Sequence, residues 1–158
     1  MTGHDPNGVA KVLWDAPAEN VRTNPSGGRS TLIWSSDAMP IPMPLGEAIE
    51  DMGARILGTP PPPNGTRFTI NDIPPGHPGR LHRTETVDYA LILAGEIDME
   101  VDNGERISLN PGDVVVQRGT NHSWINRGKG WGRIAFILID AEPLGIGHPL
   151  PRAGAAGG

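Results

Sequence analysis

The chain has 158 residues, enough for one domain with a hydrophobic core, and its lack of cysteine excludes disulfides, thiolate metal ligands and thiol nucleophiles. Its 13 Lys and Arg residues are scattered and are outnumbered by 18 Asp and Glu residues, giving a formal net charge of −5, which argues against nucleic acid as a partner. No apolar run is long enough to cross a bilayer and the first residues do not resemble a signal peptide, so we expect a cytoplasmic protein with no membrane partner.

The 22 glycines and 17 prolines divide the chain into short segments, which is typical of a structure with many turns. Runs rich in β-branched and other apolar residues predict short strands at 11–14, 30–34, 66–73, 86–93, 96–101, 106–109, 113–117, 122–126 and 133–140. One segment, 45–56, carries Ile49, Met52 and Ile56 at helical spacing and predicts a single short helix. The pattern as a whole predicts an all-β sandwich or barrel.

The proline run at 60–63 predicts an extended connector, because consecutive prolines fit neither a helix nor an inner strand. It ends an N-terminal arm, residues 1–65, which carries the first short strands and the helix and is expected to pack on the barrel. The barrel is predicted to span residues 66–142. The C-terminal tail, 143–158, has too little apolar surface to offset its ordering entropy and is expected to be flexible.

The segment from His82 to Gly95 resembles the first cupin motif, which has two histidines one residue apart, then a glutamate and a closing glycine. His82 matches the first histidine and Gly95 the glycine. Thr84 stands where the second histidine is expected, and Asp88 replaces the glutamate. The first motif is therefore degenerate at two of the positions that bind metal in the family.

The later segment from Gly119 to Asn126 resembles the second cupin motif more closely, since Gly119, His122 and Asn126 match its glycine, histidine and asparagine. Together the two motifs indicate a small single-domain monocupin of the cupin superfamily. The resemblance implies a jelly-roll β-barrel, here with an N-terminal arm and one short helix, whose interior holds a small-molecule site.

Strand geometry indicates which side chains face that interior, because residues two apart share a face. If His82 faces inward, Thr84 and Asp88 do as well. On the later strand His122, Trp124 and Asn126 share a face, so that Trp124 forms an aromatic wall beside His122. The opposite face of the 86–93 strand carries apolar side chains for packing on the N-terminal arm or on a second subunit, and such a face favours a homodimer.

The candidate catalytic residues are His82, Asp88 and His122, and two chemistries remain open for them. As metal ligands, two imidazoles and a carboxylate suit one divalent ion, Fe, Mn, Ni or Zn, in a facial triad. As a hydrogen-bonded polar cluster, they serve as general acid and base without metal, with Thr84 and Asn126 satisfying the remaining lone pairs.

Two classes of function follow. The preferred one is a lyase or isomerase that moves a proton, removes water or removes carbon dioxide from a small organic acid or aromatic metabolite; an oxygenase is the less favoured enzyme. The alternative is a non-catalytic or sensory monocupin that binds a small molecule without metal. The expected substrate-binding residues are Thr84, Trp124, Asn126 and Arg118, although Arg118 is equally consistent with pairing to a surface acid.

Overall fold

The computed structural model describes residues 1–152 and consists almost entirely of strands and turns. In chain order the strands are β1 (Thr2–His4), β2 (Ala10–Val12), β3 (Val21–Thr23), β4 (Arg29–Ser36), β5 (Thr66–Ile73), β6 (Thr86–Ala94), β7 (Ile97–Val101), β8 (Arg106–Leu109), β9 (Val114–Arg118), β10 (His122–Asn126) and β11 (Gly132–Asp140). A single 3-10 turn, Asp102–Gly104, joins β7 to β8. The prediction of an all-β fold is confirmed.

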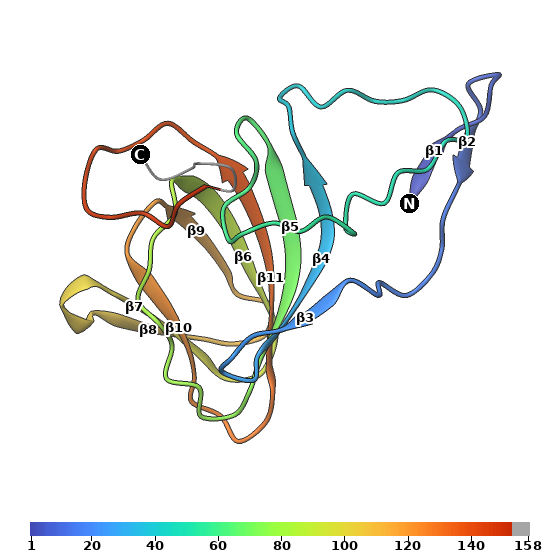
Figure 1. Cartoon of the computed structure of the whole chain (residues 1–158). Coiled ribbons are helices and arrows are strands. Elements are labelled where there is room, and N and C mark those ends of the chain that lie inside the picture. Colours follow the sequence, from blue (N-terminus) through green and yellow to red (C-terminus); the bar gives the residue numbers. More distant parts are fainter. Residues whose placement is uncertain (153–158) are drawn as a thin grey trace.

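Two antiparallel sheets form the barrel (Figure 1). The larger sheet has the strand order β3-β4-β5-β11-β6-β9, and the smaller has the order β10-β7-β8. The last strand, β11, pairs with both β5 and β6 and lies between them, so the end of the chain's barrel segment is in the middle of the larger sheet. Such a double-sheet arrangement is the predicted jelly roll, and it brings the two sequence motifs, on β6 and β10, onto facing sheets.

The hydrophobic core fills one end of the space between the sheets. Strict alternation along β6 turns Ala90 and Ile92 inward, where they meet Ile134 on the neighbouring strand β11 and Ile97 on the smaller sheet. Toward the start of β6 the inward positions change from apolar side chains to Asp88, and the core gives way to a pocket. On β6 the inward polar groups therefore lie toward the start of the strand and the apolar ones toward its end.

The predicted helix at 45–56 is wrong, since this segment contains no helix in the structure. A helix of this length is marginal without a packing partner, and Ile49 and Ile56 remain exposed. The chain instead runs close to β4, where Ser35 Oγ donates to Met52 O at 2.9 Å. A Cβ at Gly53 would lie 2.7 Å from Leu32 O, so the approach of the two backbones requires glycine.

The N-terminal residues divide between the barrel and a separate hairpin. Strands β3 and β4 extend the six-stranded sheet, whereas β1 and β2 pair only with each other and stand away from the barrel (Figure 1). Strands β1 and β3, three residues each, are additions to the strands that the sequence predicts. The domain boundaries at 65 and 142 stay predictions.

The chain after β11 folds back over the pocket end of the barrel. The buried Arg83 donates through Nη2 to Ile146 O, and Leu150 N donates to Arg83 O at 2.8 Å. These bonds bring Leu150 to the wall of the pocket. The predicted flexibility of the tail stays a prediction, and residues 153–158 lie outside the described part of the chain.

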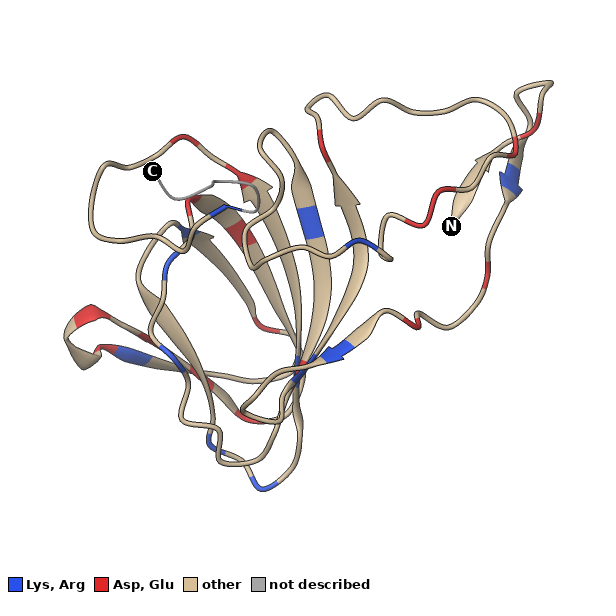
Figure 2. Cartoon of the chain, in the orientation of Figure 1, with Lys and Arg blue, Asp and Glu red and all other residues tan. Residues whose placement is uncertain are grey.

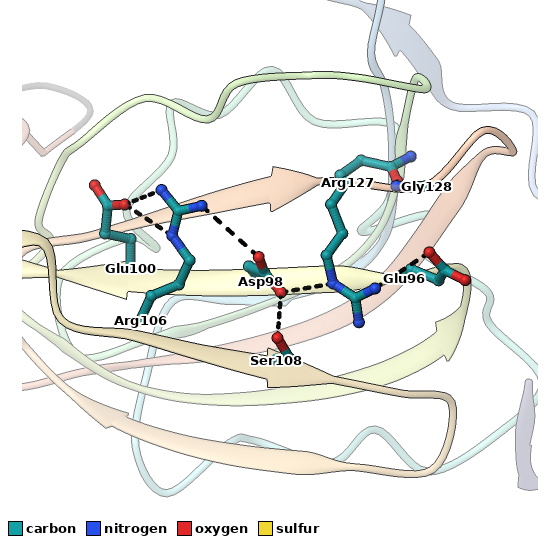
Figure 3. Close-up of polar contacts among 8 residues, drawn as sticks. Glu96, Asp98, Glu100, Arg106, Ser108, Arg127 and Gly128 are labelled. Atoms are coloured by element: carbon teal, nitrogen blue, oxygen red, sulfur yellow. Dashed lines mark hydrogen bonds and ion pairs between the residues drawn. The ribbon is translucent and has the colours of Figure 1, made fainter.

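The outer face of the smaller sheet carries a network of ion pairs (Figure 3). Asp98 accepts hydrogen bonds from Ser108 Oγ and Arg127 Nε, both at 2.8 Å, and Arg106 pairs with Glu100 on the adjacent strand. Elsewhere basic and acidic residues are interspersed (Figure 2). Within residues 1–152, no helix has the length and apolar character needed to span a membrane.

Candidate functional site

A pocket of about 230 Å³ opens inside the barrel and contains most of the predicted site residues. Its lining includes His82, Thr84, Asp88, His122 and Trp124. Pockets for drug-sized ligands have volumes of roughly 300–1,000 Å³, so this one suits a smaller metabolite.

The two histidines of the pocket lie side by side. Their backbones form an isolated β-bridge, with His82 N donating to His122 O and His122 N donating to His82 O, each at 2.9 Å, and their ring centroids are 4.3 Å apart. The Nδ1 of His82 lies 2.8 Å from Arg80 O, and the Nδ1 of His122 lies 2.9 Å from Thr120 O. Because a carbonyl oxygen only accepts, each Nδ1 carries a proton, and Nε2 of a neutral ring keeps a free lone pair.

His122 is held in its neutral form. Only 3% of its surface is exposed, and burial, together with the neighbouring ring of His82, lowers its pKa from 6.5 to about 4. Trp124 contacts the His122 ring edge-on with centroids 6.0 Å apart, and Phe136 on β11 continues this aromatic wall at 5.2 Å from Trp124. The aromatic wall beside His122 therefore exists as predicted, and it makes one side of the pocket apolar.

Asp88 ends a short chain of buried hydroxyl groups. Thr84 Oγ1 lies 2.6 Å from Thr86 Oγ1, which donates to Asp88 Oδ1 at 2.5 Å. Thr86 and Asp88 share the inward face of β6, and Thr84, two residues before the strand, is buried with them, as the alternation predicts. Burial raises the pKa of Asp88 to about 6 although the bond from Thr86 opposes this shift. A carboxyl with such a pKa exchanges protons readily near neutral pH.

The pocket only partly fits a divalent metal. The two Nε2 lone pairs suit a metal, but in residues 1–152 no group of three or more His, Cys, Asp and Glu side chains lies close enough to hold an ion. Asp88 therefore does not complete a triad with His82 and His122 in this arrangement. The predicted metal site stays a prediction, and the geometry assembles an imidazole pair and a separate carboxyl.

Two of the predicted substrate-binding residues lie away from the pocket lining. Asn126 is buried, but its Nδ2 donates to Ile73 O and Gly130 O, each at 2.9 Å, and so its amide holds a loop. Arg118 is exposed at the end of β9, opposite Val87, whose side chain points to the outer face of the sheet. The structure brings Thr84 and Trp124 to the pocket, and leaves Asn126 and Arg118 outside it.

The inward face of β5 supplies pocket residues that the sequence analysis missed. Arg67, Thr69 and Asn71 alternate along this strand and all line the pocket. The signal was present, since polar side chains occupy every second position from 67 to 71 while Phe68 and Ile70 lie between them. In most strands the polar face is the solvent face, and only the sheet register shows that here it faces the interior.

The jelly roll and the imidazole-lined interior together define a cupin-type protein, and comparison with known proteins agrees. The model of the cupin domain family matches residues 70–138. The chain is 37% identical, over 95% of its length and 82% of the relative, to phomopsin biosynthesis cluster protein C' of Diaporthe leptostromiformis. This chain belongs to the cupin family.

Other relatives extend the comparison. The chain is 32% identical to the cupin-domain-containing oxidoreductase fogC of Aspergillus ruber, covering 91% of this chain and 72% of that protein. Among solved structures, a cupin 2 conserved barrel domain protein from Salinispora arenicola CNS-205 superposes with a TM-score of 0.55 at 17% identity, covering 83% of this chain and 92% of that one. The structural likeness concerns the fold alone.

Proposed function

We propose that the chain is a small-molecule enzyme whose barrel pocket transfers protons on a small organic metabolite, as a lyase or isomerase. The observation that carries this proposal is the presence, in one small pocket, of a carboxyl with a pKa of about 6 and an imidazole kept neutral by burial. Groups with pKa values moved in this way are typical of acid–base sites.

Asp88 is the proposed base. Above pH 6 its carboxylate accepts a proton from a substrate carbon next to a carbonyl group, and the electron pair of the broken C–H bond moves to the carbonyl oxygen as an enolate forms. The Thr86 hydroxyl holds the carboxylate in place through its 2.5 Å bond. Burial also favours the protonated form of Asp88, which returns the proton to another carbon and completes an isomerisation.

The imidazole pair has a positioning role in this proposal. Since Nδ1 of each ring is bound to a backbone carbonyl, the Nε2 atoms of His82 and His122 are available to accept hydrogen bonds from substrate hydroxyl groups. The ring of Trp124 beside His122 supplies apolar contact for an aromatic or alkyl part of the substrate.

Exchange of substrate hydrogen with solvent tests the proposal without knowledge of the product. The protein is incubated in D2O with a panel of small oxo acids and aromatic ketones, and deuterium uptake is followed by mass spectrometry. We expect uptake above the buffer rate for at least one compound, and a loss of about a hundredfold or more in Asp88→Asn, the usual effect of removing a general base. Arg118→Gln is the matched control and keeps full activity.

Three results would count against this proposal. Equal uptake by wild type and Asp88→Asn would remove Asp88 from the reaction. Uptake lost equally in Arg118→Gln would show that the effect is not specific to the pocket. Saturable binding with no chemical change for any compound in the panel would favour the alternative, a small-molecule-binding monocupin without catalysis.

A metal-dependent oxidoreductase is the second candidate, and the names of several relatives favour it. Elemental analysis of the purified protein, with oxygen consumption measured before and after treatment with a chelator, separates it from the first. About one equivalent of Fe, Mn, Ni or Zn per chain, lost in His122→Ala, together with chelator-sensitive oxygen consumption, would replace the metal-free acid–base mechanism.

A further inference from the structure

We propose that Arg67 forms an anion-binding subsite inside the pocket and that its ligand is the carboxylate of a small organic acid. This inference rests on the proposed function, in which Asp88 is the base. It adds the class of substrate, a monocarboxylate that binds Arg67 while Asp88 faces the reacting carbon. The observations that carry it are the position of Arg67 on the pocket wall, its lack of an acidic partner within residues 1–152 and the burial of its Nε atom.

The sheet register places Arg67 and Asp88 on one row of the inner face. Leu138 on β11 pairs with Arg67 on β5 and with Asp88 on β6, so that the apolar Leu138 lies between the two charged residues. Neighbouring strands are about 4.8 Å apart, which puts the two backbones roughly 10 Å from one another. A ligand of a few carbon atoms spans this gap with its anionic end at Arg67.

The guanidinium of Arg67 is the available cation of the pocket. Its Nη1 donates to Thr59 O at 2.7 Å, its Nε is buried without a hydrogen-bond partner, and it forms no ion pair with any residue between 1 and 152. Arg29, which also lines the pocket, pairs with Asp72 at 3.3 Å. Arg80 lies exposed at the rim, where water solvates its charge.

Partial burial of this charge without an acidic partner is costly. Desolvation and the nearby charge of Arg22 lower the pKa of Arg67 to about 10, so the side chain still carries its positive charge at pH 7. An isolated buried charge lowers stability unless it is paired, and a bound anion supplies that partner. The binding free energy of a carboxylate at this position therefore includes relief of the unpaired charge.

A carboxylate fits this subsite better than a phosphate does. The planar guanidinium matches the two oxygens of a carboxylate, and the ionised Asp88 on the same row repels a dianion more strongly than a monoanion. A volume of about 230 Å³ also favours a small acid.

Binding of benzoate and of its neutral analogue benzamide tests the subsite separately from catalysis. Affinity is measured by calorimetry at pH 7.5 for the full chain, for Arg67→Gln and Arg67→Lys, and for Arg118→Gln as an exposed control arginine. We expect wild type to bind benzoate more tightly than benzamide. Loss of a charge-assisted bond in Arg67→Gln should weaken benzoate binding by about tenfold to a hundredfold.

The variants separate a binding role from a structural one. Benzamide affinity should be unchanged in Arg67→Gln, Arg67→Lys should bind benzoate at an intermediate level, and Arg118→Gln should match wild type. Absence of saturable benzoate binding, equal benzoate affinity in Arg67→Gln, or tighter binding of inorganic phosphate than of benzoate would overturn the assignment. Because no turnover is measured, these results hold whether or not the proton-transfer proposal survives.

Discussion

Asp88 and His122 show one physical cause acting in two directions. Both side chains are buried in the same barrel, with 4% and 3% of their surfaces exposed, and burial disfavours the charged form of each. The pKa of the carboxyl therefore rises to about 6 and the pKa of the imidazole falls to about 4. At pH 7 the pocket therefore holds a carboxylate at Asp88 and, separately, a neutral imidazole at His122, and the carboxylate suits proton abstraction more than proton donation.

The raised pKa of Asp88 predicts that this residue lowers stability at neutral and alkaline pH. The folded state binds the proton more tightly than the unfolded state, so the stabilisation is present below about pH 4 and is lost as pH rises through 6. Asp88→Asn should therefore raise the free energy of unfolding by about 3 kcal/mol at pH 8 and have little effect at pH 4, since the pKa rises from 3.8 to about 6 and one pKa unit corresponds to about 1.4 kcal/mol.

Urea unfolding at the two pH values measures this effect. Asp102→Asn, an exposed carboxyl in the turn after β7, is the control and should stay within about 0.5 kcal/mol of wild type at both pH values. A destabilised Asp88→Asn at pH 8 would show that the native carboxylate is better stabilised than its burial implies.

At the scale of single residues, the motif resemblance located the histidines and Asp88, and strand alternation placed Thr84 beside them. Neither the motif nor the alternation predicted Arg67 as a site residue, because an arginine in an alternating strand is normally on the solvent side. The motif resemblance also predicted that Asn126 binds the substrate, whereas the hydrogen bonds of its amide are made to backbone atoms. Which polar groups remain free is a property of the folded contacts, and the sequence does not contain it directly.

At the scale of elements, the turn between β6 and β7 depends on a close contact of two glycines. Gly95 has a φ of +87°, and a Cβ at this position would lie 2.7 Å from the Cα of Gly132 at the start of β11. The glycine that closes the first motif therefore has a packing role besides its turn conformation.

Two alanine substitutions separate these roles. Gly112 has a φ of +98° in an open turn, where an added Cβ would have no neighbouring atom within 4 Å, so Gly112→Ala should cost only the conformational strain of about 1–2 kcal/mol. Gly95→Ala should cost about 1–3 kcal/mol more, because the added methyl meets backbone atoms that cannot rotate away. Thermal unfolding of both variants measures the difference, and equal losses would contradict the packing role.

The strands of the barrel are predictable because each run of β-branched and apolar residues is bounded by turn-forming residues. The predicted bounds 66–73, 106–109 and 122–126 coincide with β5, β8 and β10. The predicted helix at 45–56 does not form, because three apolar residues at helical spacing do not stabilise a short helix unless they are buried, and Ile49 and Ile56 are exposed. A close approach of two backbones, such as that of Gly53 to β4, leaves no periodic pattern in the sequence and so cannot be predicted from hydrophobic periodicity.

At the scale of the whole molecule, the larger sheet has an apolar outer face near its β9 edge. Tyr89 on β6 pairs with Val116 on β9, and Leu91 pairs with Val114. Three of these four side chains are exposed and none is charged. An uncharged patch is compatible with a copy of itself across a twofold axis, so we propose a second copy of this chain as its partner.

Light scattering after size exclusion tests the proposed homodimer. Wild type should have twice the mass of the chain, and Val114→Lys combined with Val116→Lys should shift it to the monomer, because like charges would face each other across the axis. Ile107→Lys, an exposed apolar position on β8, should remain dimeric. A monomeric wild type, or a double variant that stays dimeric, would contradict this interface.

The central claim, that the barrel is an acid–base site, is tested most directly by NMR titration of its two key groups. With selectively labelled protein, the carboxyl carbon of Asp88 should titrate near pH 6. The ring of His122 should remain neutral, with its proton on Nδ1, from pH 7 down to about pH 5. A carboxyl that titrates near pH 4 together with an imidazole that titrates near pH 6.5 would contradict the account, because neither group would then be prepared by the fold for proton transfer.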